Sequence, residues 1–269
     1  MIKYTFFWIF TLLFVFSCQT VPVTGRKQFA FMPASEMQAQ SYVAYKQFLD
    51  TSRLSANSDQ VAMVKRVGER IRTAVEQYMA EKNLSSRLQG FQWEFNLIEN
   101  KAANAWCMPG GKVVFYSGIM PICQDESGVA VVMGHEVAHA IAEHGNERMS
   151  QTLTAQGLLT AGQVVVQQNP TMFRQIMLQA AGVSTQLGLL KFSRQQESEA
   201  DRIGLIFAAL AGYDPQAAVS FWQRMDAQAG GQAPPEFLST HPSHSTRIRD
   251  LNKWQAEAMN YYQRSRYKK

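Results

Sequence analysis

The stretch "VVMGHEVAHAIAEHG" (131–145) places His135 and His139 four residues apart, with Glu136 beside the first. On a helix, residues four apart differ by only about 40° in azimuth, so two imidazoles one turn apart can share a metal ion. Glu136 projects beside that face, where its carboxylate reaches a water on the metal without being a ligand. The stretch therefore predicts a helix that carries a hydrolytic metal site.

A catalytic zinc site needs a third protein ligand and an open position for water. His144 is the nearest candidate, but the metzincin pattern HExxHxxGxxH requires glycine at 142 and histidine at 145. This chain has Ala142 and Gly145. We therefore expect His144 to pack against or cap the end of the helix, with Gly145 as the residue that ends it.

The segment "QQESEAD" (195–201) places Glu197 and Asp201 four residues apart on a second predicted helix. This spacing predicts Glu197 as the third ligand. Asp201 is expected to accept a hydrogen bond from the outer nitrogen of a ligating histidine and thereby fix its tautomer. Glu199 is the rival ligand, but it points about 200° away from Glu197 around the helix.

A late segment, "THPSHSTRI" (240–248), supplies two further candidates. The oxyanion that forms during hydrolysis needs a second electrophile, and His241 or Arg247 can provide it. Alternatively, His241 approaches the metal and blocks it in a resting state. For Arg247, a structural ion pair is an alternative that the sequence favours as much as a role in stabilising the oxyanion.

Taken together, "HEVAH" and "ESEAD" resemble the zinc metallopeptidases related to HtpX and the CAAX prenyl proteases, within the gluzincins. "NAWCMPGG" (104–111) and "THPSHSTRI" agree with this family, and "CQTVPVTGRKQF" (18–29) resembles its small bacterial outer-membrane lipoprotein members. The resemblance implies one Zn²⁺ per chain in a zincin-type domain. We expect an α+β, predominantly helical fold with a small sheet edge next to the HExxH helix.

The N-terminus "MIKYTFFWIFTLLFVFSC" (1–18) contains an apolar run too short for a membrane span, which needs about 20 residues. We interpret residues 1–17 as a lipoprotein signal peptide, with a lipid on Cys18 that anchors the chain to a membrane and 18–35 as a tether. Residues 36–269 form one predicted metallopeptidase domain. Gln19 in place of aspartate favours the outer membrane, facing the periplasm. The alternatives are a plain signal peptide or short anchor with an incidental cysteine, and a cytosolic enzyme with an uncleaved anchor.

Composition narrows the function further. Hydrophobic residues make up 46% and charged residues 17% of the 269 residues, as in a folded globular protein. The net charge of +5 is spread along the chain without a recognition module, so we expect no nucleic-acid partner. A disulfide between Cys107 and Cys123 is left open, as is the oligomeric state.

The predicted secondary structure consists of helices and two strands. Apolar spacing predicts helices over 36–50, 58–83, 125–145, 193–214, 214–228 and 246–262, packing helices within 150–190, and strands over 91–98 and 112–116. The piece "GGKVVFY" (110–116) is expected to expose an edge on which an extended peptide pairs.

These residues predict a zinc-dependent endopeptidase in which Glu136 takes a proton from water and later gives it to the leaving amine. The family resemblance implies unfolded or misassembled envelope proteins as substrates. The alternative is a metal-stabilised, non-catalytic periplasmic chaperone or assembly factor with the same site. A second alternative, an exopeptidase, requires a pocket for a free chain end.

Overall fold

The computed structural model of the chain describes residues 18–155, 193–229, 237–241 and 246–268. The predicted signal peptide, most of the region 150–190 with its predicted packing helices, and His244, which we expected to be an exposed loop histidine, lie outside these ranges. A three-stranded sheet forms from β3 (Glu94–Ile98), β4 (Ala105–Met108) and β5 (Lys112–Tyr116). Its order is β3-β5-β4, with β3 and β5 parallel and β4 antiparallel to β5.

Strand β5 is therefore the centre of the sheet, and the prediction that it exposes an edge is wrong. Strand β4 pairs with one edge of β5, and β3 pairs in parallel with the other edge, so neither edge of β5 is left unpaired. The edge on the other side belongs to β4. Among the described residues, no further strand pairs with β4.

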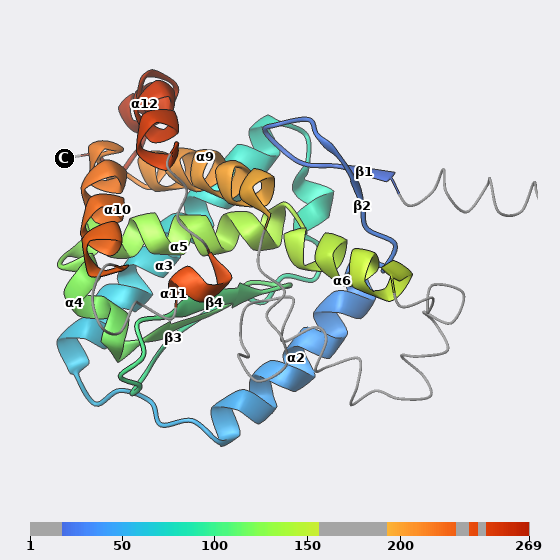
Figure 1. Ribbon diagram of the computed structural model, residues 1–269, viewed down its shortest axis with the longest axis horizontal. Helices are drawn as coiled ribbons and strands as arrows, with labels where there is room; N and C mark the ends of the chain where they lie inside the picture. Colours follow the sequence, from blue (N-terminus) through green and yellow to red (C-terminus); the bar gives the residue numbers. More distant parts are fainter. Residues whose placement is uncertain (1–17, 156–192, 230–236, 242–245, 269) are drawn as a thin grey trace, which may run out of the picture.

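Helices cover both faces of the sheet, as Figure 1 shows. Val113 and Phe115 of β5 join the core cluster of helices α3 (Ser58–Glu81) and α5 (Glu126–Ile141). Val114 and Tyr116 face the opposite way and pack with residues of α2 (Ala34–Asp50). Successive side chains of a strand point to opposite faces, so a strand covered on both faces reads as an unbroken apolar run.

The remaining elements surround this core. They are β1 (Cys18–Thr20), β2 (Lys27–Phe29), α4 (Met120–Cys123), α6 (His144–Ala155), α9 (Arg194–Leu210), α10 (Gln216–Ala229), α11 (Phe237–Thr240) and α12 (Arg247–Gln263), with 3-10 turns over Ser85–Leu88 and Ser117–Ile119. The predicted fold class, mostly helical with a small sheet next to the HExxH helix, is confirmed.

Helices α5 and α9 run side by side through the middle of the molecule (Figure 1). They meet at Gly134 and Gly204, where a Cβ added to Gly134 would lie 2.6 Å from the carbonyl oxygen of Gly204. Two backbones can approach this closely only where both residues lack a side chain. The close crossing places the acidic turn of α9 opposite the histidine turn of α5.

Helix α5 ends earlier than predicted. Ala142 is its C-cap, and Glu143 takes the left-handed backbone conformation, with φ 57°. Glu143 thus provides the turn that we expected from Gly145. Gly145 lies inside α6, which begins at His144. The chain consequently bends between His139 and His144 instead of continuing as one helix.

Residues 18–32, expected as a tether, lie against the domain. Strands β1 and β2 pair antiparallel with Cys18 opposite Phe29. Val21, Gln28 and Met32 are buried, and the Gln28 amide donates to the carbonyl of Ala142 at 2.7 Å. We call residues 18–29 the N-terminal hairpin.

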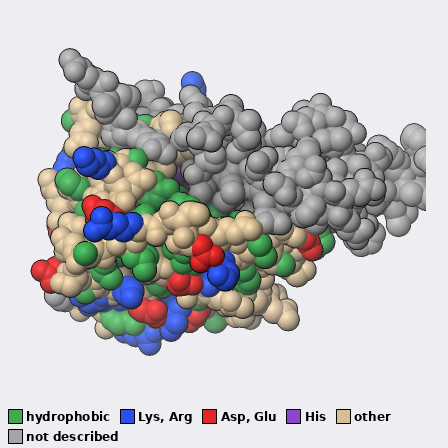
Figure 2. Space-filling model, turned by 90° about the horizontal axis from the view of Figure 1, so that it is seen from below, with side chains coloured by type: hydrophobic (Ala, Val, Ile, Leu, Met, Phe, Trp, Pro, Cys, Tyr) green, Lys and Arg blue, Asp and Glu red, His purple; other side chains and the backbone are tan. Residues whose placement is uncertain are grey.

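No helix in the described ranges is both long and apolar enough to cross a membrane. On the face shown in Figure 2, lysine and arginine side chains alternate with aspartate and glutamate, as on an ordinary solvated surface. Cys107 and Cys123 are both buried and free, so the structure contains no disulfide between them.

Candidate metal centre

Helix α5 presents His135 and His139 on one face, with their Nε2 atoms 3.1 Å apart. Both side chains are buried. Glu197, near the start of α9, faces them across the helix crossing. Its Oε2 lies 3.7 Å from His135 Nε2 and its Oε1 lies 3.4 Å from His139 Nε2. The structure therefore brings together the three predicted metal ligands from two distant parts of the chain.

A further histidine, His241, follows α11 and joins these three residues. Its Nδ1 lies 3.0 Å from Glu197 Oε1 and 3.3 Å from His135 Nε2. One ligand atom from each of His135, His139, Glu197 and His241 lies within 4.8 Å of all the others. His241 thus stands among the candidate metal donors, as the blocking alternative requires.

The nitrogen of His135 that faces away from this cluster meets a carboxylate. His135 Nδ1 lies 3.0 Å from Asp201 Oδ1, one turn after Glu197 on α9. A carboxylate only accepts hydrogen bonds, so the proton belongs on Nδ1 and the lone pair on Nε2. Asp201 therefore occupies the place from which it fixes the tautomer of a ligand.

Arg247, the first residue of α12, is buried and binds both carboxylates of α9. Its Nε donates to Asp201 Oδ2 at 2.7 Å and its Nη2 to Glu197 Oε2 at 2.5 Å. Its guanidinium also lies 3.7 Å from the ring centre of Trp222. These contacts commit the guanidinium to orienting Glu197 and Asp201, which favours the ion-pair alternative over an oxyanion role.

His139 is supported differently, through residues to which we assigned no such role. Its Nδ1 lies 2.9 Å from His144 Nδ1, and His144 Nε2 lies 3.2 Å from Glu199 Oε2. Glu199 does point away from Glu197, as expected, but towards this second histidine. On one continuous helix His139 and His144, five residues apart, would point in different directions. They meet because the chain bends at Glu143, and that bend was not predicted from the sequence.

The contact with Glu199 determines which ring nitrogens of His144 and His139 carry protons. Burial lowers the pKa of His144 despite the opposing effect of Glu199, so its ring is neutral. Glu199 accepts from His144 Nε2, which leaves a lone pair on His144 Nδ1 and places the proton on His139 Nδ1. His135 and His139 then turn bare Nε2 lone pairs towards each other at 3.1 Å, which is repulsive unless a cation lies between them. Two imidazoles and a carboxylate suit Zn²⁺, so the residues fit the implied metal.

Glu136 is buried beside the cluster, with its Oε1 3.5 Å from His241 Nε2. Burial, the largest cause, raises the pKa of Glu136 to about 8. That value belongs to the metal-free protein; a cation held by His135 and His139 would favour the ionised form of Glu136, in which its carboxylate can accept a proton. The arrangement can therefore combine a metal with an adjacent general base.

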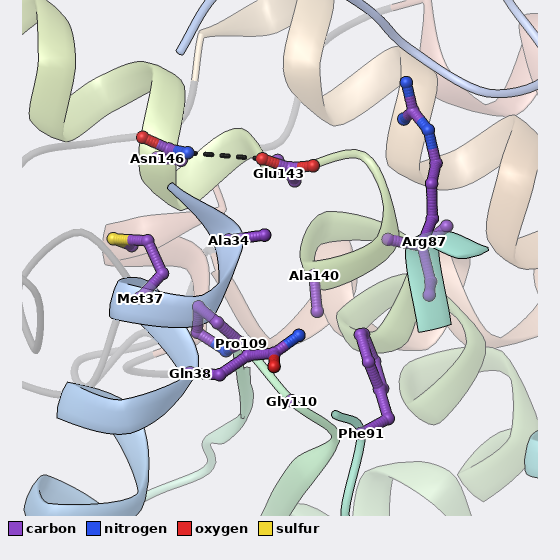
Figure 3. Close-up of a pocket in the computed structure, with 11 residues that line it drawn as sticks. Ala34, Met37, Gln38, Arg87, Phe91, Pro109, Gly110, Ala140, Glu143 and Asn146 are labelled. Carbon is purple, nitrogen blue, oxygen red and sulfur yellow. Dashed lines mark hydrogen bonds between the residues drawn. The ribbon is translucent and has the colours of Figure 1, made fainter. Parts of the chain in front are cut away.

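A small cavity of about 30 Å³ lies elsewhere, between α2, the turn after β4 and the end of α5. Figure 3 shows Ala140 at its wall and the hydrogen bond between Asn146 and Glu143 beside it. None of the predicted ligands lines it. Its volume suits a water molecule rather than a peptide.

Comparison with known proteins identifies the family. Residues 65–255 match Peptidase family M48. Mitochondrial metalloendopeptidase OMA1 of Schizosaccharomyces pombe is 34% identical over 88% of this chain and 66% of its own length. The Arabidopsis thaliana OMA1 is 37% identical over 62% of this chain and 32% of its own. The beta-barrel assembly-enhancing protease of Escherichia coli is 34% identical over 59% and 33%.

The chain thus spans between about a third and two thirds of the length of these relatives. The predicted location, lipid-anchored to the bacterial outer membrane, is contradicted, because the relatives from yeasts, a plant and animals are mitochondrial metalloendopeptidases. The motif resemblance is confirmed at the level of the peptidase family, without the narrower likeness to lipoprotein members. The chain belongs to Peptidase family M48.

Proposed function

We propose that this protein is a zinc-dependent endopeptidase that cleaves unfolded or misassembled polypeptides. One observation carries the proposal: the donor atoms of His135, His139 and Glu197 converge from two helices, with Glu136 buried beside them. A purely structural metal site needs no adjacent base. The names of the relatives, metalloendopeptidases and a protease, support the same activity.

When bound, zinc supplies a Lewis acid that polarises the scissile carbonyl and lowers the pKa of water. Glu136 accepts a proton from the attacking water and donates it to the leaving amine. Arg247 and Asp201 hold Glu197 and His135 in place. His241 would supply a fourth donor to the metal in the resting protein, and it would then have to withdraw before a peptide could bind.

Strand β4 is the proposed docking edge for an extended substrate. It contacts α5 and is the edge strand on the side away from β3, and because all four of its residues are buried, this edge must be uncovered before a peptide can pair with it. A peptide that adds to such an edge pairs through its main chain, which reads little side-chain identity. This mode suits unfolded chains as substrates.

Two further points stay predictions: one zinc ion per chain, and a lipid on Cys18. Mass spectrometry of the N-terminus of the purified protein tests the second.

Cleavage of unfolded casein by wild type and by Glu136→Gln tests the proposal. We expect the variant to lose about 10²–10⁴-fold in rate while keeping its zinc. Chelation should abolish wild-type cleavage and zinc should restore it. Equal cleavage by the variant would refute the role of Glu136. Absence of cleavage in wild type under every metal condition would favour the non-catalytic chaperone instead.

A further inference from the structure

The N-terminal hairpin reaches the support of His139 through two side chains. Thr24 Oγ1 donates to Glu199 Oε1 at 2.7 Å, and Arg26 Nε donates to Glu199 Oε2 at 2.7 Å. His144 Nε2 lies 3.2 Å from that same Oε2. Glu199 is therefore held between the hairpin and the imidazole that contacts His139.

Arg26 is itself fixed in place by a second carboxylate. Its Nη1 and Nη2 donate to Glu147 Oε1 and Oε2 at 2.6 and 2.8 Å. Gln196 also donates to Glu147 Oε2, at 2.6 Å. A fork between two carboxylates suits the planar guanidinium of arginine and not the point charge of lysine.

Arg26, Glu147 and Glu199 together hold unequal numbers of positive and negative groups. Arg26 carries one positive charge, while Glu147 and Glu199 carry two negative charges, and Glu199 is the one in contact with His144. The Glu199 carboxylate faces His144, which contacts His139, and through this contact it can strengthen the ligand nitrogen of His139.

We propose that Thr24 and Arg26 of the N-terminal hairpin are positioning residues for the metal centre, acting on His139 through Glu199 and His144. The hairpin is then part of the metal site although none of its residues is a ligand. This inference rests on the proposed function only for the identity of the metal.

Zinc affinity, measured by competition with a chromophoric chelator, tests the inference without reference to cleavage. We expect Arg26→Ala to weaken zinc binding about tenfold, Arg26→Lys to restore little of it, and Thr24→Val to cause a smaller loss. Arg87→Ala is the matched control, because Arg87 Nη2 holds the same hairpin through the carbonyl of Thr20 at 2.8 Å and does not touch Glu199. Its zinc affinity should stay close to that of wild type.

A double-mutant cycle separates positioning from general docking of the hairpin. In a Glu199→Gln background, Arg26→Ala should cause little further loss of affinity, because its route to His144 is already broken. An unchanged zinc affinity in Arg26→Ala, an equal loss in Arg87→Ala, or additive losses in the cycle would each overturn the inference. Failure to cleave casein would overturn the proposed function and leave this result standing.

Discussion

His135 and His139 lie one turn apart on the same face of α5, but different side chains hold their rings in place; we call these side chains the support of each histidine. His135 is backed directly by Asp201, which Arg247 holds in turn, and all three are buried in the α5–α9–α12 core. His139 is backed by His144, and only then by Glu199. The first support is short and lies within the core, whereas the second extends to the N-terminal hairpin. Two ligands that lie four residues apart on one helix can therefore be held in place by quite different parts of the chain.

Removing Glu197, which faces both histidines, should have the largest effect. We expect Glu197→Ala to purify without stoichiometric zinc, against about one zinc per wild-type chain, by elemental analysis. Glu199→Ala, on the same helix, should still bind zinc, although more weakly. A wild-type zinc content in Glu197→Ala would remove the common centre on which the comparison depends.

Breaking the short support comes next. Asp201→Asn should weaken zinc binding about 10–100-fold, because Asn no longer fixes the proton on His135 Nδ1 as a carboxylate does. Chelator competition measures the change. Asp250→Asn, a matched change on α12 whose carboxylate contacts Arg249, should have no effect. An unchanged affinity in Asp201→Asn would mean that His135 needs no partner.

Breaking the long support should cost less. Glu199→Gln is expected to weaken zinc binding about tenfold, since His144 stays in contact with His139 and loses only the charge behind it. Glu257→Gln, which disrupts the ion pair with Arg202, is the control. If Glu199→Gln lost more affinity than Asp201→Asn, the ranking of the two supports would be reversed.

A separate prediction concerns the stability of the metal-free protein and Glu136, which belongs to neither support. In the metal-free protein its pKa of about 8 lies above the ordinary 4.5, so the folded state binds more protons than the unfolded state between these values. Stability contributed by this group is therefore lost as pH rises from 4.5 to 8. Glu136→Gln should stabilise metal-free protein by about 1–3 kcal/mol more at about pH 8 than at about pH 5.

Thermal melts of the metal-free protein at both pH values measure this difference. Glu69→Gln, which removes an exposed carboxylate from α3, is the matched control and should show no such dependence. A stability change in Glu136→Gln that is the same at both pH values would contradict the raised pKa.

Local spacing predicted the parts of the site that one helix can specify. The four-residue repeats in α5 and α9 predicted His135 with His139 and Glu197 with Asp201, and the match to Peptidase family M48 confirms the peptidase family that these motifs indicated. The contact between Arg26 and Glu199 was not predictable in this way, because the two residues are 173 positions apart.

The same distinction explains the sheet. Strands β4 and β5 are neighbours in the chain, joined by Pro109, Gly110 and Gly111, and they pair antiparallel. The position of β5 at the centre depends on β3, which joins it in parallel from an earlier part of the chain. Likewise, the end of α5 follows from Glu143 in a left-handed conformation, which glycine-based rules assign to Gly145.

The glycine contact between α5 and α9 has a consequence for how the enzyme can move. With backbone resting on backbone at Gly134 and Gly204, no side chain is available there to rearrange as a hinge. The ligands of these two helices should keep their spacing whether or not a peptide is present. If the proposed function holds, a peptide would reach the metal donors through movement of His241, which follows α11, rather than through separation of α5 and α9.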